Sequence, residues 1–175
     1  MLLAEVERLT RELAGAKAEV QRLSALAEED PLCAILNRRG FDREFKRSAA
    51  HVARYGTAAA LLLIDLDDFK DINDASGHAA GDAVLKDVAS VLSRGLRESD
   101  VVARIGGDEF AVILWHAGLD EALAIGARLT ASLPSPASFG AAAFERDACS
   151  GILERADLAL YAAKRRKGET NGVRR

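Results

Sequence analysis

The first apolar residues of the chain recur at alternating steps of four and three positions, which predicts a long helix with one narrow apolar stripe. The stripe consists of Leu2, Val6, Leu9, Leu13, Ala16, Val20, Leu23 and Ala27. Two apolar positions in seven are fewer than a helix normally uses to pack on a globular domain. Valine recurring at one position and leucine at the other favour a parallel two-stranded coiled coil, with a single helix lying on its own domain as the alternative.

This pattern stops at Glu29-Asp30-Pro31, because proline disfavours a helical conformation in the residue before it. We therefore place a domain boundary here. Residues 1–29 are predicted to be a coiled-coil dimerisation helix, and residues 30–175 to be one globular domain.

Strand and helix patterns are mixed along the rest of the chain. In order, they predict a helix over 38–54, a strand over 58–65, a short helix over 69–73, a longer helix with its apolar stripe over 84–96, strands over 101–105 and 110–115, a helix over 119–133, a strand over 138–143 and a helix over 152–166. Strands joined by a hairpin and interspersed with helices indicate an α+β fold, with a central sheet flanked by helices.

Composition narrows the classes of function. With 175 residues and 49% hydrophobic content, the chain is long enough for one ordinary core. With a net charge of −3, the chain has no overall positive field to attract nucleic acid, so we do not expect a polymeric nucleic acid as a partner. The longest purely apolar run, 58–64, is far below the roughly 20 residues of a membrane helix. Glu5 and Glu7 stand where a secretory signal would be basic, so we expect a cytoplasmic protein with no membrane partner.

An acidic cluster follows the most apolar strand. Residues 61–64 are all apolar, and Asp65-Leu66-Asp67-Asp68 comes directly after them. A strand that is apolar throughout is buried on both faces, so Asp65 should emerge at the edge of the core, where a charge needs a partner or a metal. Acids after strands also begin turns or cap helices, and by itself this cluster does not decide between the two.

A second acidic site lies in the predicted hairpin. Gly106-Gly107 stands between two apolar runs and suits a tight turn with positive φ, and Asp108-Glu109 follows. Side chains alternate along a strand, so the two acids should point in opposite directions. If the hairpin lies beside Asp65, the carboxylates would form an oxygen-ligand site suited to magnesium and phosphates; a solvated hairpin tip is the alternative.

The segment Arg104 to Phe110 resembles the signature of the GGDEF family of diguanylate cyclases, whose five signature letters are complete from Gly106 to Phe110. The resemblance extends from Asp30 to about Asn171. Its ordered motifs are Asp30-Pro31-Leu32, Asn37-Arg38-Arg39-Gly40-Phe41, Asp65 to Asp82 and Ala156 to Lys164. It implies a mostly antiparallel five-stranded sheet flanked by helices, related to the palm of polymerases and nucleotidyl cyclases, with the hairpin in the active site.

The resemblance also implies roles for individual residues. Asp65, Asp108 and the carbonyl of Leu66 match ligands of Mg²⁺, or of Mn²⁺ in its place, and Glu109 matches the catalytic acid nearest the reacting hydroxyl. The residues that match the GTP site are Asn73 and Asp82 for guanine, the backbone of Asp68 and Phe69 and the side chain of Lys164 for the phosphates, and Gly106 and Gly107 in the hairpin. The aspartate at 82 argues for GTP over ATP. As single residues, Asn73 and Asp82 are equally suited to capping a helix.

Three segments depart from the family pattern. Lys167-Gly168-Glu169 follows Lys164 where a glycine and a second cation are usual, so Arg165, Arg166 or Lys167 takes that role or GTP binds more weakly. Cys33-Ala34 replaces threonine and glycine. The link from Leu133 to Ser138 is short and omits a strand or hairpin.

A second site is implied by Arg97 and Asp100, which match the family's inhibitory motif for the product, cyclic di-GMP, and by Arg128, which matches a further arginine of that site. Arginine forks suit phosphates and the Hoogsteen edge of guanine. As an isolated pair, Arg97 and Asp100 would be only a surface ion pair.

Together these features predict a diguanylate cyclase that condenses two GTP molecules into cyclic di-GMP and two pyrophosphates across a homodimer, with product feedback inhibition. The alternatives are a noncatalytic cyclic di-GMP receptor and a coiled-coil scaffold with a vestigial domain.

Overall fold

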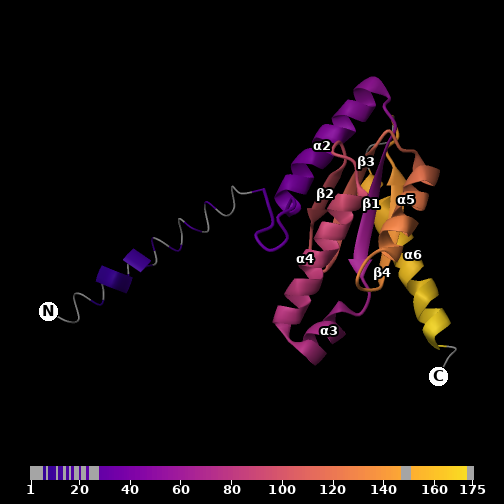
Figure 1. Cartoon of the computed structure of the whole chain (residues 1–175). Coiled ribbons are helices and arrows are strands. Elements are labelled where there is room, and N and C mark those ends of the chain that lie inside the picture. The colour runs from indigo at the N-terminus through magenta and orange to yellow at the C-terminus, as the bar shows by residue number, and fades with distance from the viewer. Residues whose placement is uncertain are drawn as a thin grey trace.

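The computed structural model describes residues 28–146 and 151–172, with side chains as far as Lys167, and individual helical positions between residues 6 and 23. Its sheet has the order β2-β3-β1-β4, and every neighbouring pair is antiparallel (Figure 1). The strands are β1 (Ala59–Leu66), β2 (Val101–Arg104), β3 (Glu109–Trp115) and β4 (Ala137–Ala143). The predicted antiparallel sheet flanked by helices is confirmed, with four strands in the described part of the chain where five were expected.

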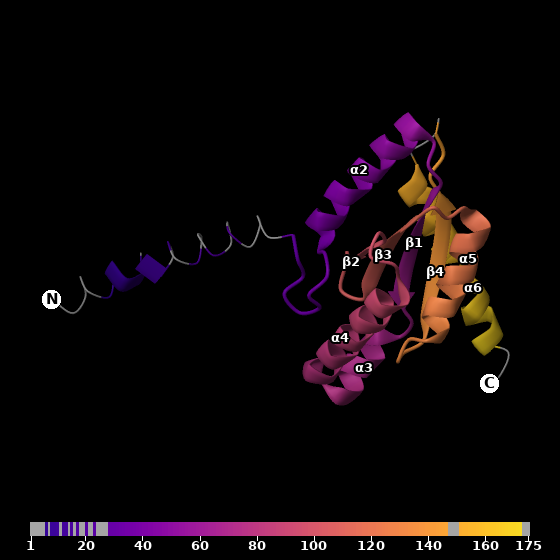
Figure 2. The same ribbon diagram turned by 45° about the horizontal axis from the view of Figure 1, so that its top comes forward.

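Five helices surround this sheet. They are α2 (Arg38–Tyr55), α3 (Phe69–Ser76), α4 (His78–Gly95), α5 (Leu119–Ala131) and α6 (Ile152–Gly172). Helices α4 and α5 cover one face of the sheet, whereas α2 and α6 cover the other (Figure 2). Helix α6 extends beyond its predicted end at Arg166, so Gly168 does not stop the helix. None of the described helices combines the length and apolarity that crossing a membrane requires.

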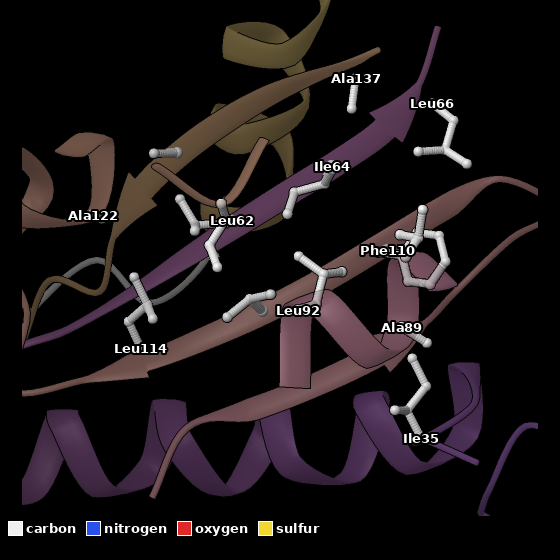
Figure 3. Close-up of a cluster of buried hydrophobic side chains, with 14 of the residues drawn as sticks. Ile35, Leu62, Ile64, Leu66, Ala89, Leu92, Phe110, Leu114, Ala122 and Ala137 are labelled. Carbon is white, nitrogen blue, oxygen red and sulfur yellow. The ribbon is translucent and has the colours of Figure 1, made fainter. Parts of the chain in front are cut away.

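The central strand β1 explains the continuous apolar run in the sequence. All eight of its residues are buried, because helices cover both faces. Leu62 and Ile64 belong to the core under α4 and α5, where they pack with Phe110 and Leu92 (Figure 3). Leu61 belongs to the opposite core under α2 and α6. The strand is therefore fixed from both sides, which fixes Asp65 near its end.

The short link before β4 leaves that strand at the edge of the sheet. Only residues 132–136 separate α5 from β4, and β1 is the one strand paired with β4 in the described part of the chain. Two carbonyls of the strand accept hydrogen bonds from α6: Ala137 from Lys167 Nζ at 2.5 Å, and Ala143 from Arg155 Nη2 at 3.2 Å. Cationic side chains of α6 thus occupy part of the polar backbone that an edge strand would otherwise present.

Five residues of the N-terminal apolar stripe have described side chains, and all are exposed. The exposed fractions are 54% for Val6, 50% for Leu9, 57% for Leu13, 61% for Val20 and 52% for Leu23. The described parts of this helix also lie away from the sheet in both views (Figures 1 and 2). Leu2, Ala16 and Ala27 lie outside the described residues. At these five positions the stripe does not pack on the chain's own domain.

Candidate active site

The structure brings the two acidic segments together on neighbouring strands. Asp65 of β1 lies directly opposite Glu109 of β3 in the register. The next backbone contact continues this pairing, since Leu66 N–H donates to the Asp108 carbonyl at 3.2 Å. The N–H and C=O of one strand residue point to the same side, so the Leu66 carbonyl also faces Asp108. The predicted juxtaposition of the strand-end acid with the hairpin acids is therefore present.

Asp65 carries a carboxylate in an environment that disfavours its charge. The residue is only 8% exposed. Burial raises the pKa of its carboxyl, Lys164 lowers it, and the neighbouring Asp108 and Asp67 raise it further. Lys164 Nζ lies 2.6 Å from Asp65 Oδ1, so the buried carboxylate is paired with an ammonium group. A buried carboxylate needs such a cationic partner, and a bound metal ion would meet the same need.

These groups fit a hard divalent cation. Asp65 and Asp108 supply carboxylate oxygens, and Leu66 supplies a backbone carbonyl beside them. Magnesium is commonly held by one or two carboxylates, with water and substrate oxygens in the remaining positions, so this small set of protein ligands is compatible with it.

The hairpin loop owes its shape to side chains. Neither Gly106 nor Gly107 has a positive φ, so the expected positive-φ turn is wrong. A Cβ at Gly106 would overlap the Glu109 carboxylate, so the glycine leaves room for the position that this side chain takes here. Arg104 donates from Nε and Nη2 to the Gly107 carbonyl, at 3.1 and 2.7 Å, and pairs with Asp30 at 3.2 Å. This brace from the domain entry to the hairpin was not predicted from the sequence.

Glu109 is exposed and shares with Asp65 the sheet face that α6 covers, since directly opposed residues point to the same face. A cavity of about 370 Å³ opens beside it, with Leu63 and Leu160 among the apolar lining residues. Glu109 thus faces an accessible space at the end of the hairpin, which suits an acid that acts on a bound molecule.

Asn73 and Asp82 both lie near the junction of α3 and α4. A Cβ on Gly81 would overlap Asn73 Oδ1, so the Asn73 amide lies against the first turn of α4. Asp82 follows Gly81 in that turn and is exposed. The chain turns between the two helices at Gly77, whose φ of 80° L-residues rarely adopt. The two residues predicted to read the base are therefore on neighbouring segments, and their role stays a prediction.

The turn between β1 and α3 has an unusual backbone. Asp68, the residue before α3, has a φ of 54°, and its side chain makes no capping hydrogen bond to the helix. The first amides of a helix have no partner within the helix, so those near Phe69 are available to an anion. Lys164 lies beside this region through its contact with Asp65. Of the three candidates for the second cation, Lys167 reaches the turn, with Nζ 2.7 Å from Asp67 Oδ2.

The three residues predicted for a regulatory site also come together. Arg97, Asp100 and Arg128 line a small cavity of about 140 Å³ between α4 and α5. The Asp100 carboxylate is held in place by two backbone donors, Arg97 N and Trp115 N, each at 3.0 Å. Arg128 donates to the Gly95 carbonyl at 3.0 Å. The role of Trp115 in anchoring Asp100 was not visible in the sequence.

Comparison with known proteins gives consistent matches. The family described as "Diguanylate cyclase, GGDEF domain" matches residues 27–170. Diguanylate cyclase DgcP of Pseudomonas aeruginosa is 38% identical, covering 94% of this chain and 27% of its own length. Diguanylate cyclase TpbB of the same species is 37% identical, covering 99% of this chain and 42% of its own length. The chain thus spans less than half of either relative.

Among solved structures, a similar one contains the coiled coil and GGDEF domain of DgcB from Caulobacter crescentus in complex with c-di-GMP. The two chains superpose with a TM-score of 0.74 at 29% identity, and the match covers 94% of each. The shared region includes the N-terminal part of this chain as well as the domain that carries the acidic residues.

Proposed function

Because this chain belongs to the GGDEF domain family of diguanylate cyclases, we propose that it condenses two molecules of GTP into cyclic di-GMP and two of pyrophosphate. One observation carries the proposal: the buried Asp65 carboxylate lies beside Asp108 and opposite Glu109, so the three acids proposed for catalysis are neighbours. Incubation of the protein with GTP and Mg²⁺, followed by identification of the product by mass, is the direct test.

The proposed reaction needs two copies of the domain, since each 3′-hydroxyl attacks the α-phosphate of the GTP in the facing domain. The exposed apolar stripe of the N-terminal helix supports such a dimer, because a coiled coil would bury it. The similarity to a solved coiled coil and GGDEF domain over the same length agrees with this arrangement.

Asp65, Asp108 and the Leu66 carbonyl would hold magnesium. When bound, the metal supplies positive charge that lowers the pKa of the attacking hydroxyl and neutralises charge on the phosphoryl oxygens. Glu109 would accept the hydroxyl proton; its position opposite Asp65 at the accessible end of the hairpin supports this role.

The remaining residues position the nucleotide. Lys164 and the first amides of α3 would bind the phosphates. Lys164 would then exchange its present partner, the Asp65 carboxylate, for a phosphate oxygen. The Asp82 carboxylate can accept from the guanine N1–H and amino group, while the Asn73 amide offers both a donor and an acceptor. Holding the attacking hydroxyl and the α-phosphate in one geometry would account for much of the rate enhancement.

A noncatalytic receptor for cyclic di-GMP is the second candidate. The observation that favours it is the cavity lined by Arg97, Asp100 and Arg128. This cavity is separate from the proposed catalytic acids of the hairpin and β1. A receptor would bind the cyclic dinucleotide without converting GTP, so the product assay separates the two functions.

We expect the enzyme to prefer GTP to ATP by about 10²-fold or more in kcat/KM, because adenine would leave the Asp82 carboxylate without its donors. Asp82→Ala should remove most of this preference by lowering the rate with GTP. Asp87→Ala, an exposed acid on the same helix, is the matched control and should leave both rates unchanged. Comparable synthesis of cyclic di-AMP and cyclic di-GMP by the unaltered protein would contradict the role of Asp82.

We expect cyclic di-GMP to inhibit its own synthesis through the cavity between α4 and α5. Arg97→Ala should weaken cyclic di-GMP binding at least about tenfold, since a charged hydrogen-bond donor is removed, and should leave the initial rate nearly unchanged. Arg94→Ala, on the last turn of α4 and outside this cavity, is the control. Calorimetry reports the affinity and pyrophosphate release the rate. A lower initial rate with unchanged product affinity would assign Arg97 to the active site.

A further inference from the structure

Lys167 contacts a residue beside the proposed phosphate site. Its Nζ lies 2.7 Å from Asp67 Oδ2 and 2.5 Å from the Ala137 carbonyl. The other carboxylate oxygen of Asp67 accepts from Ser138 Oγ at 2.7 Å. Asp67 is thus held on both oxygens, once from α6 and once from β4. Ser138 is only 2% exposed, so its end of this arrangement is fixed within the core.

The backbone of Asp67 is held as well. Its N–H donates to the Pro136 carbonyl at 2.9 Å, so the main chain of Asp67 is tied to the short link before β4, while its side chain is tied to β4 and α6. Lys167 completes this clamp, which we define as Lys167, Asp67 and Ser138. The contacts of the clamp join α6, the start of β4 and the turn that follows β1.

The clamp lies next to a strained residue. Asp68 has a φ of 54°, a region that non-glycine residues rarely adopt, and its side chain provides no capping hydrogen bond to α3. Such a conformation persists only when its surroundings hold it. In the described structure, the hydrogen bonds of Asp67 are the support immediately before it. The direction in which α3 begins, and so the direction of its first amides, depends on this turn.

Lys164 and Lys167 lie one helical turn apart on α6 but have different surroundings. Lys164 contacts only the Asp65 carboxylate among the ion pairs and hydrogen bonds described, at the metal site. Lys167 is engaged by two protein oxygens on different elements, at 2.7 and 2.5 Å. Its ammonium is therefore fixed in the protein scaffold, whereas Lys164 is poised to exchange partners.

We propose that Lys167 is a positioning residue, which through Asp67 holds the strained turn so that the first amides of α3 face the terminal phosphates of GTP. This inference rests on the proposed function. In this chain, the second lysine of α6 then serves the phosphates indirectly, by ordering the backbone that binds them.

The test uses the full chain with Lys167→Met, Lys167→Arg and the matched control Lys46→Met, which makes the same change at an exposed lysine of α2. The probe is guanosine 5′-(β,γ-imido)triphosphate with Mg²⁺, measured by calorimetry, with GMP as the ligand that lacks terminal phosphates. Lys167→Met should weaken binding of the triphosphate about tenfold and binding of GMP less than twofold. Lys167→Arg should restore most of the affinity, and Lys46→Met should resemble the unaltered protein.

Hydrogen exchange of the amides of residues 68–70, measured without nucleotide, gives a readout that does not depend on activity. Lys167→Met should raise these rates severalfold, because the turn loses its support. Asp67→Asn should have the same effect, and the double variant should be no worse than either single one, since both remove one clamp. Melting temperatures establish that every variant is folded.

Three outcomes would overturn the proposal. Unchanged exchange with weaker triphosphate binding would mean that Lys167 contacts the phosphate itself. If the losses of Lys167→Met and Asp67→Asn add up in the double variant, Lys167 does not act through Asp67. If Lys167→Met changes neither the exchange rates nor the affinity, Lys167 has no positioning role. If the unaltered protein bound neither nucleotide, the proposed function would fail, and the exchange rates would still report whether Lys167 holds the turn.

Discussion

Glu109→Gln is expected to lower the rate of cyclic di-GMP synthesis by about 10²–10⁴-fold, the contribution typical of a positioned general base. The glutamine has nearly the same volume, and Glu109 is exposed, so the substitution removes the proton acceptor with little effect on packing. Turnover is measured from pyrophosphate release, with the product identified by mass. Glu154→Gln makes the same change elsewhere in the cavity beside Glu109 and should retain the unaltered rate.

Asp65→Asn and Asp108→Asn should reduce synthesis at least as far, because each removes charge from the proposed metal site. Asp65→Asn has a second expected effect. Burial raises the pKa of the Asp65 carboxyl, so its ionised form opposes folding at neutral pH, and the amide should leave the melting temperature unchanged or higher. If Asp65→Asn is inactive but no less stable than the unaltered protein, Asp65 serves the reaction rather than the stability of the fold. Near-normal turnover in all three variants would show that the site is elsewhere.

Deletion of residues 1–28 is expected to have the second largest effect. The reaction needs two GTP-loaded domains face to face, and a tether raises their effective concentration toward the millimolar range. At nanomolar protein, specific activity should fall at least about tenfold and then rise steeply as the enzyme is concentrated. Sedimentation measures the dimer and pyrophosphate release the rate under the same conditions.

A milder change tests the same helix without deleting it. Leu9→Lys with Leu23→Lys places charge at two exposed positions of the apolar stripe, which should dissociate a coiled coil and leave the catalytic domain folded. Gly15→Lys puts a lysine outside the stripe and should leave the dimer intact. If the truncated chain remains a dimer with full activity, the stripe has another role.

Features set by local pattern were predictable from the sequence. The continuous apolar run fixed β1 as a buried strand, so the position of Asp65 at the edge of the core followed directly. The hairpin was also predicted, but the pattern left open whether it lies beside Asp65; the family resemblance placed it in the active site, and the structure pairs Glu109 with Asp65. The short link before β4 indicated a missing strand, and four strands are present in the described part of the chain.

Features set by distant contacts were not predictable in the same way. Lys167 and Asp67 are 100 residues apart in the chain, and only the packing of α6 beside β4 brings them together. Gly106 was expected to adopt a positive φ in the turn, but its φ is not positive, and the Glu109 carboxylate lies against it instead. The end of α6 was placed too early because glycine disfavours a helix by only about 1 kcal/mol, which neighbouring residues can outweigh.

The most direct test of the central proposal is to incubate the full chain with GTP and Mg²⁺ at a concentration where sedimentation shows a dimer, and to identify the products by mass. The account predicts cyclic di-GMP with two pyrophosphates released for each product, and neither when Glu109 is replaced by glutamine. A dimer that binds cyclic di-GMP but leaves GTP unconverted would contradict it and identify the chain as a receptor.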